Sequence, residues 1–191
     1  LDIPEKEKRK IRGAGIGMIF QDAGASLCPI RTIGEQIYES MRAHTKITRS
    51  EAKSRAMDLF DKLNFKDSQR VWDSYPFELS GGMNQRAGIA IAMLMNPPIL
   101  FADEPTSALD VSVQRQVVRE MLKLRELFGT AIVLVTHDIG VVRAMADTVL
   151  VLKNGKTVEY GTADRVLNHP QDPYTRKLLE AVPKLQRKVR V

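Results

Sequence analysis

Two patterns of hydrophobic and polar positions alternate along the chain. Short apolar runs that end in polar residues are typical of buried strands, and they occupy positions 15–20, 99–104 and 130–136. Longer stretches repeat their apolar residues with the period of a helix, and they occupy positions 32–43, 48–63, 80–94, 111–128 and 139–146. Strands that alternate with helices predict an α/β fold with a mostly parallel sheet flanked by helices.

Several predicted helices separate the first strand from the second. Thr48 and Glu51 have the spacing of a capping box, which predicts that the helix over 48–63 begins there. Consecutive helices after a strand indicate a helical subdomain inserted into the α/β core, over about residues 30–96.

The C-terminal part of the chain begins with a predicted hairpin, because Asn154-Gly155 is typical of a tight turn between two strands. Gly155-Lys156-Thr157 imitates the end of a phosphate-binding loop. However, Leu150 stands where the first glycine should be, and a strand follows instead of a helix, so we reject a phosphate loop here. Two short helices are expected after the hairpin, over 162–168 and from Asp172 onward.

Composition limits the class of protein. The chain has 191 residues, of which 43% are hydrophobic, and these suffice for one sizeable core and a single domain over 1–191. No apolar run is long enough to span a bilayer, and the only cysteine, Cys28, excludes an intrachain disulfide. Much of the net charge of +6 lies in residues 1–12 and 184–190, which we predict to be solvated, poorly ordered ends.

Two adjacent carboxylates end the second predicted strand. Asp103 and Glu104 follow the apolar run, and Pro105 stops it. Successive side chains of a strand point to opposite faces, so one carboxylate can hold a metal ion while the other polarises a water. Phosphoryl transfer needs that division of roles. Taken alone, Asp-Glu-Pro also fits a strand end followed by an acidic turn.

The other two strands also end in polar residues. Gln21 follows the first strand, and His137 follows the third. The carboxyl ends of parallel strands meet at one edge of a sheet, where ligands bind. We therefore expect Gln21, Asp103, Glu104 and His137 to converge at that edge.

A serine and two glycines open the helix predicted at 80–94. Ser80 can cap this helix, and Gly81 and Gly82 leave the backbone N–H groups of its first turn uncovered. Such a helix N-terminus is a natural phosphate site. An ordinary capped helix with a flexible entry explains the same residues equally well.

Taken in order, these segments resemble the ATP-binding subunit of ABC transporters. The matching motifs are Gln21 (Q-loop), Leu79–Arg86 (signature motif), Ile99–Glu104 (Walker B), Ser107–Asp110 (D-loop) and His137 (switch histidine). Five motifs in this order are very specific, and the resemblance covers essentially the whole chain. Residues 18–22 and 168–183 also resemble a narrower group, the dipeptide, oligopeptide and nickel importers.

The resemblance implies roles for the residues at the strand ends. Asp103 would hold Mg²⁺, and Glu104 would orient or deprotonate the attacking water. His137 would contact the γ-phosphate. Gln21 would sense Mg²⁺ and the γ-phosphate and couple to the membrane subunit.

The resemblance also implies roles in a dimer. Ser80, Gly81, Gly82 and Gln85 of the signature motif would complete the ATP site of the opposite subunit, and Asp110 would cross the dimer interface. The implied cofactors are ATP and Mg²⁺. The implied partners are transmembrane permease subunits and a second ABC ATPase subunit, with no nucleic acid. The implied place is the cytoplasmic face of the inner membrane, where the subunit would be peripheral and would energise import of peptides or a related solute.

The family's phosphate loop, G-x-x-x-x-G-K-[ST], precedes the Q-loop, and no such sequence occurs before Gln21. We therefore expect an N-terminally truncated ABC ATPase domain of the P-loop NTPase type, without its first strands, that binds ATP weakly by itself. One alternative is a non-catalytic partner that supplies the signature motif to a heterodimer. Another is a soluble ABC-type ATPase acting on nucleic acid, against which the importer-type extension at about 161–191 argues.

Overall fold

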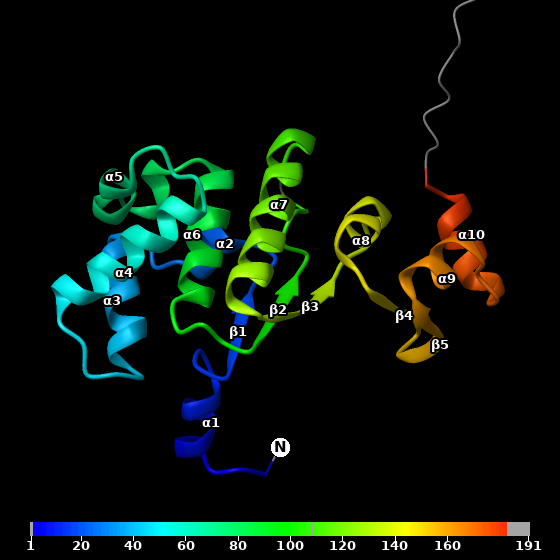
Figure 1. Ribbon diagram of the computed structural model, residues 1–191, viewed down its shortest axis with the longest axis horizontal. Coiled ribbons are helices and arrows are strands. Elements are labelled where there is room, and N and C mark those ends of the chain that lie inside the picture. The colour runs from blue at the N-terminus through cyan, green and yellow to red at the C-terminus, as the bar shows by residue number, and fades with distance from the viewer. Residues whose placement is uncertain (1, 108, 183–191) are drawn as a thin grey trace, which may run out of the picture. The chain divides into compact units, whose positions relative to one another are not determined.

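The computed structural model describes residues 2–107 and 109–182 (Figure 1). The chain forms two compact units, one within residues 1–135 and one within residues 136–191. The basic positions at 184–190, predicted to be solvated, lie outside the described residues.

A three-stranded parallel sheet forms the centre of the first unit. Its strands, in spatial order, are β1 (Ile16–Ile19), β2 (Ile99–Asp103) and β3 (Ala131–Val135). Ile19 pairs with Ala102, and Asp103 pairs with Val135. The predicted parallel α/β sheet is therefore confirmed.

Only helices lie between β1 and β2 in the described part of the chain. They are α2 (Ala23–Ser26), α3 (Ile33–Arg42), α4 (Arg49–Lys62), α5 (Ser68–Asp73), the 3₁₀ helix η1 (Pro76–Glu78) and α6 (Gly81–Met93). The predicted capping box of α4 is confirmed, because the Glu51 N–H donates to the Thr48 hydroxyl at 3.2 Å and the Thr48 N–H donates to the Glu51 carboxylate at 2.8 Å. The hydrophobic pattern did not predict α5, whose Trp72 packs against Gly34 of α3; a Cβ on that glycine would lie 2.3 Å from the indole ring.

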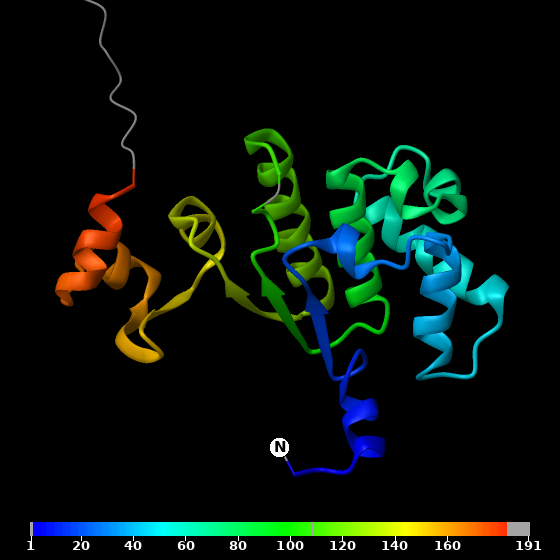
Figure 2. The same ribbon diagram turned by 180° about the vertical axis from the view of Figure 1, so that it is seen from behind.

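Helices α6 and α7 (Val111–Phe128) lie on one side of the sheet (Figures 1 and 2). The sheet side chains on the covered face include Ile19, Leu100 and Ala102, each at most 2% exposed. The β1 backbone approaches α6 closely, since a Cβ on Gly17 would lie 2.6 Å from the carbonyl oxygen of Ala92. A core of sheet and helices thus fixes the edge at which the strands end.

The prediction that residues 1–12 are poorly ordered is wrong. Residues Glu5–Ile11 form helix α1, although none of them is buried. Opposite charges stabilise its surface, because Lys10 contacts Glu7 and Arg12 contacts Glu5, each at 2.8 Å. The alternating signs of these charges, rather than an apolar face, favour the helix.

The second unit contains a hairpin and three helices within its described residues. These are α8 (Ile139–Met145), β4 (Thr148–Lys153), β5 (Lys156–Thr162), α9 (Ala163–Asn168) and α10 (Pro173–Glu180). Asn154 and Gly155 have φ values of 49° and 74°, so both central residues of the hairpin turn are left-handed. The tight turn is confirmed, and Gly155-Lys156-Thr157 belongs to it and to β5.

A buried carboxylate joins β5 to the start of α10. Glu159 is 8% exposed and accepts hydrogen bonds from the N–H groups of Gln171 and Asp172 at 2.8 and 3.2 Å. The Gln171 hydrogen bond is the main cause that lowers the pKa of Glu159 below its ordinary value of 4.5.

Among the described residues, no helix has the length and apolarity needed to cross a membrane.

Candidate functional site

Gln21 and the Asp103-Glu104 pair leave the sheet at the same edge. Ile19 pairs with Ala102, so Gln21, two residues beyond Ile19, is level with Glu104, two residues beyond Ala102. Gln21 and Asp103 are exposed, and Glu104 is half-buried. The structure therefore brings together three of the four polar residues predicted at the strand ends.

Glu104 has an unusual backbone. Its φ of 46° lies in the left-handed region, which residues other than glycine and asparagine rarely adopt. The end of β3 helps to hold it there, because the Glu104 N–H donates to the carbonyl oxygen of Val135 at 2.9 Å. The Glu104 carbonyl in turn accepts from the N–H and the hydroxyl of Ser107, at 3.2 and 3.1 Å. Strained conformations of this kind concentrate at functional sites.

His137 belongs to the second unit. It follows Val135 by two residues, is exposed, and precedes Asp138, the N-cap of α8. The Asp138 carboxylate accepts from the N–H groups of Gly140 and Val141 at 2.7 and 3.2 Å. The capped helix holds the backbone next to His137, and the convergence of His137 with the other strand ends stays a prediction.

The carboxylates at the end of β2 suit a magnesium ion that is shared with phosphates. Within residues 2–107 and 109–182, no three His, Cys, Asp or Glu side chains cluster closely enough to hold a metal by themselves. Mg²⁺ prefers oxygen ligands and is usually bound by one or two carboxylates, with water and substrate phosphates as the other ligands. Asp103 and Gln21 offer such oxygens at an exposed edge, so the residues fit the ion.

The first turn of α6 is open on one side and tightly packed on the other. Ser80 caps the helix and accepts from the N–H of Met83 at 3.3 Å. A Cβ on Gly81 would meet nothing within 4 Å, whereas a Cβ on Gly82 would lie 2.6 Å from Cγ1 of Val113 in α7. Gly81 therefore leaves the backbone accessible to a ligand, and Gly82 allows α6 to approach α7.

Gln85 does not reach the surface of this chain. Its side chain is 5% exposed, and its amide nitrogen has no hydrogen-bond partner in the structure. It is thus separated from the exposed Ser80 and Gly81, and a contact of Gln85 with nucleotide stays a prediction.

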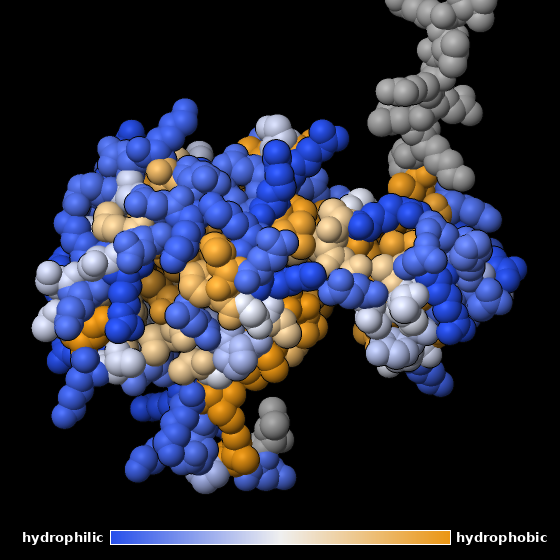
Figure 3. All heavy atoms as spheres, in the orientation of Figure 1, coloured by the Kyte–Doolittle hydropathy of each residue, from blue (hydrophilic) through white to orange (hydrophobic). Residues whose placement is uncertain are grey.

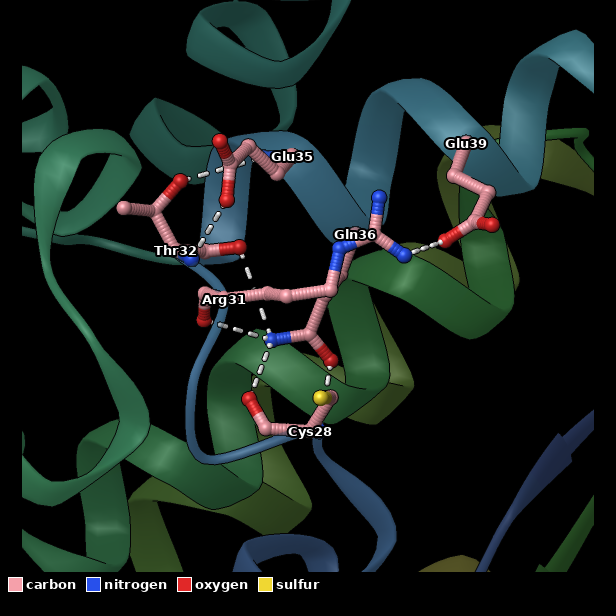
Figure 4. A network of polar contacts seen from close by, with 6 residues as sticks. All are labelled: Cys28, Arg31, Thr32, Glu35, Gln36 and Glu39. Carbon is pink, nitrogen blue, oxygen red and sulfur yellow. Dashed lines mark hydrogen bonds and ion pairs between the residues drawn. The ribbon is translucent and has the colours of Figure 1, made fainter.

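The segment after Gln21 packs on α6 and is then fastened to α3. Ala23 in α2 is buried against α6, where a Cβ on Gly88 would lie 3.2 Å from that of Ala23. Further along, the Gln36 amide oxygen accepts from the N–H of Cys28 at 2.8 Å (Figure 4). The Gln36 amide nitrogen donates to the carbonyl oxygens of Cys28 and Arg31 at 3.1 and 3.0 Å. One side chain therefore holds the loop at 28–31 against α3.

An ion pair connects the signature helix to its surroundings. Arg86 of α6 lies 3.5 Å from Glu120 of α7, which is 2% exposed. The Arg86 guanidinium also donates to the carbonyl oxygen of Leu63 at 3.1 Å and lies 4.5 Å from the centre of the Phe65 ring. Burial raises the pKa of Glu120, and the hydrogen bond from Gln116 and the charge of Arg86 partly oppose this. The pair fixes α6 against α7 and the end of α4.

Asp110 caps its own helix. Its carboxylate accepts from the N–H groups of Ser112 and Val113 at 2.9 and 3.0 Å, and from the Ser112 hydroxyl at 2.7 Å. The Val113 hydrogen bond is the largest cause that lowers the pKa of Asp110. The contact across a dimer interface stays a prediction.

Two residues that hold elements near the site were missed in the sequence. Gln36 holds the loop at 28–31, and Glu120 pairs with Arg86 of α6. Neither lies in a recognisable motif.

Comparison with known proteins decides the family. Residues 2–107, more than half of the chain, match the ABC transporter family. The chain belongs to this family. Residues 158–190 of this ABC transporter chain also match the C-terminal region of oligopeptide/dipeptide transporters.

Curated relatives carry import functions in their names. A putative peptide import ATP-binding protein of Brucella melitensis is 46% identical over 183 residues, which are 96% of this chain and 54% of the relative. A probable peptide ABC transporter ATP-binding protein, y4tR of Sinorhizobium fredii, is 41% identical over 98% of this chain and 56% of its own length. The glutathione import ATP-binding protein GsiA of Escherichia coli is 45% identical over 94% of this chain and 29% of its own length. The ABC transporter chain thus spans about half the length, or less, of these relatives.

Solved cassettes share the fold. The dimeric ATP-binding cassette MJ0796, in a post-hydrolysis state bound to ADP and Pi, is 32% identical with a TM-score of 0.73. The match covers 85% of the ABC transporter chain and 68% of the solved chain.

Proposed function

We propose that this chain is part of an ATP-binding subunit that energises an ABC importer for peptides or a related solute. The observation that carries the proposal is the sheet edge with Gln21, Asp103 and a left-handed Glu104, in a chain that also contains an importer-type region. Its relatives are named for the import of peptides or glutathione. The partners would be transmembrane permease subunits and a second cassette, at the cytoplasmic face of the inner membrane.

The residues at the sheet edge divide the chemistry. Asp103 and Gln21 would hold Mg²⁺, which supplies charge neutralisation for the phosphates of ATP when bound. Glu104 would accept a hydrogen bond from the attacking water and orient it, and His137 would contact the terminal phosphate. Asp110 would cross the dimer interface. The chain has no glycine-rich phosphate loop of its own, so we expect weak ATP binding and no steady-state hydrolysis by the 191 residues alone.

The exposed start of α6 supports a second role, as donor of the signature motif. Ser80 is exposed, and Gly81 leaves the helix N-terminus open to an anion. In this role the residues Ser80, Gly81, Gly82 and Gln85 would complete an ATP site whose phosphate loop belongs to another subunit. Nucleotide would then promote association of this chain with an intact cassette.

Both roles are tested with the purified chain and the Brucella melitensis relative as the intact cassette. We expect no measurable ATP turnover by the chain alone and ATP-dependent association with the relative, weakened at least tenfold by Ser80→Ala. Steady-state turnover by the chain alone, abolished by Glu104→Gln, would refute the expected dependence on a partner. Salt-sensitive binding of DNA or RNA in place of ATP-dependent association would favour a nucleic-acid ATPase instead.

A further inference from the structure

Two segments of the first unit carry an excess of positive charge. Residues 2–12 contain five lysines and arginines and three carboxylates, and residues 42–51 contain three lysines and arginines and one carboxylate. Together these segments have four more cations than carboxylates, whereas the rest of residues 1–135 has two more carboxylates than cations. The positive charge is therefore local to the two segments.

The two segments are in contact although α2 and α3 separate them in the sequence. Gly13 follows α1 with a φ of 86°, and a Cβ on it would lie 2.8 Å from Nε2 of His44. His44 lies two positions after the end of α3, and its N–H donates to the carbonyl oxygen of the buried Met41 at 3.0 Å. Figures 1 and 2 show α1 and the turn between α3 and α4 on the same, lower side of the first unit. The charges of both segments thus lie on one surface.

Five exposed cations of this surface have no counter-ion in the described part of the chain. The carboxylates of α1 are already paired, Glu7 with Lys10 and Glu5 with Arg12, each at 2.8 Å. The cations that form no ion pair among the described residues are Lys6, Arg9, Arg42, Lys46 and Arg49, which we call the basic patch. Figure 3 shows hydrophilic residues at the surface over α1 and over the turn between α3 and α4.

A pocket of about 460 Å³ opens between the end of α3 and the start of α4. Its lining residues are Arg42, Thr45, Lys46, Ile47, Thr48 and Glu51. The Glu51 carboxylate is engaged in capping α4, because it accepts from the N–H and the hydroxyl of Thr48 at 2.8 and 2.7 Å. Arg42 and Lys46 are the cations of this pocket, and both side-chain types bind phosphate groups in proteins.

We propose that the basic patch, with this pocket, binds the phosphate groups of anionic phospholipids in the membrane that holds the permease. The inference rests on the proposed function, which places the subunit at the cytoplasmic face of the inner membrane. Anionic lipids give that leaflet a negative surface potential, and clusters of about four to eight lysines and arginines are typical of segments that bind it. The five cations of the basic patch meet this requirement on an ordered helix and turn.

The composition of the two segments favours a membrane over nucleic acid. Proteins that bind single strands combine cations with aromatic side chains on which the bases stack. Residues 2–12 and 42–51 contain no Phe, Tyr or Trp. A flat array of phosphates, which offers charge without bases, therefore matches the basic patch better.

The basic patch is separate from the residues that would contact nucleotide. Helix α1 precedes β1, whereas Gln21 follows the other end of that strand. Lipid binding therefore needs neither nucleotide nor permease. Loss of vesicle binding would leave the ATP-dependent association with a cassette untouched, and vesicle binding without that association would count against the proposed function alone.

The test measures binding of the 191-residue chain to phosphatidylcholine vesicles with and without phosphatidylglycerol, in the absence of nucleotide. We expect tighter binding to the vesicles with phosphatidylglycerol, and we expect added salt to weaken it. Two double variants, Lys6→Gln with Arg9→Gln and Arg42→Gln with Lys46→Gln, should each weaken this binding about 25-fold, because each cation near an anionic surface contributes roughly fivefold.

Two control variants distinguish the basic patch from net charge. Arg115→Gln with Arg119→Gln removes two exposed cations from α7 and should change vesicle binding by less than about twofold, because charges beyond a Debye length of about 8 Å are screened. Arg42→Lys with Lys46→Arg keeps both charges in the pocket and should bind like the original chain.

Four results would overturn the proposal. The first is equal binding to vesicles with and without phosphatidylglycerol. The second is unchanged vesicle binding in both double variants. The third is release from vesicles by inorganic phosphate at an ionic strength at which chloride has no effect, which would assign the pocket to a free phosphate. The fourth is duplex DNA that binds more tightly than the vesicles and is released by the same double variants.

Discussion

Gly82 and Val113 are in contact at the point where the signature helix meets α7. A Cβ on Gly82 would lie 2.6 Å from Cγ1 of Val113, closer than real Cβ atoms approach. A Cβ on the neighbouring Gly81 would meet only open space. The two glycines of the motif therefore have different structural roles: Gly82 allows α6 to approach α7, and Gly81 leaves the start of α6 open.

This difference predicts opposite effects of alanine. Gly82→Ala should lower the free energy of unfolding by about 1–3 kcal/mol, as overpacking does. Gly81→Ala is the matched control and should be neutral or slightly stabilising, because it restricts only the unfolded chain. Urea denaturation of both variants measures the difference, and equal effects would contradict the packing argument.

The Arg86–Glu120 pair predicts that loss of the cation alone destabilises the fold more than loss of both charges. Arg86→Ala leaves a buried carboxylate without its cation and should cost about 3–5 kcal/mol at pH 7. Adding Glu120→Gln should recover part of this loss, because the amide carries no charge. Arg119→Ala, at an exposed position of α7, should change stability by no more than about 0.5 kcal/mol.

The same pair predicts a pH dependence. The folded-state pKa of Glu120 is raised, so the folded state binds its proton more tightly than the unfolded state does. This contribution is fully present below the ordinary value of 4.5 and is lost as the pH rises through the raised pKa. The stability difference between the original chain and Glu120→Gln should therefore change across that window in thermal unfolding scans. A constant difference would show that Glu120 does not titrate there.

The pH dependence of stability expected from Glu159 has the opposite sign to that expected from Glu120. Its pKa is lowered, so its contribution is present above 4.5 and is lost as the pH falls through the lower folded-state pKa. Glu159→Gln should remove this dependence and speed hydrogen exchange at the amides of Gln171 and Asp172, which lose a charged acceptor. Lys156→Gln, in the same strand and exposed, serves as the control and should leave both amides protected.

Two substitutions of Asp110 distinguish its helix-capping role from a role at a dimer interface. Asp110→Ala should lower the melting temperature, whereas Asp110→Asn keeps an acceptor for the N–H groups of Ser112 and Val113 and should preserve it. If Asp110 also crosses a dimer interface, Asp110→Asn should weaken ATP-dependent association while stability is unchanged. Association equal to that of the original chain would restrict Asp110 to its cap.

The features predicted correctly from sequence depend on local patterns. The strand ending in Asp103, the capping box at Thr48 and the Asn154-Gly155 turn each place their decisive residues within a few positions of one another. The resemblance to ABC transporters depends on motif order, which also needs no knowledge of contacts. Neighbouring residues and their order along the chain therefore suffice to predict these features.

The features that were missed depend on distant or weak interactions. Arg86 and Glu120 are 34 positions apart, and nothing in either neighbourhood indicates the other. Helix α5 has only six residues, too few for a helical period to stand out. The prediction of a poorly ordered start missed helix α1. This helix buries no side chain, so no apolar period marks it, and the ion pairs that stabilise it link exposed charges.

The grip of Gln36 on the loop at 28–31 has a mechanical consequence. Because three hydrogen bonds join the loop to α3, we expect a displacement that begins at Gln21 to be absorbed in residues 22–27 or to move α3 as well. A single amide side chain thus ties the loop that follows Gln21 to the helical region. Gln36→Ala would remove these hydrogen bonds and should release the loop at 28–31 from α3.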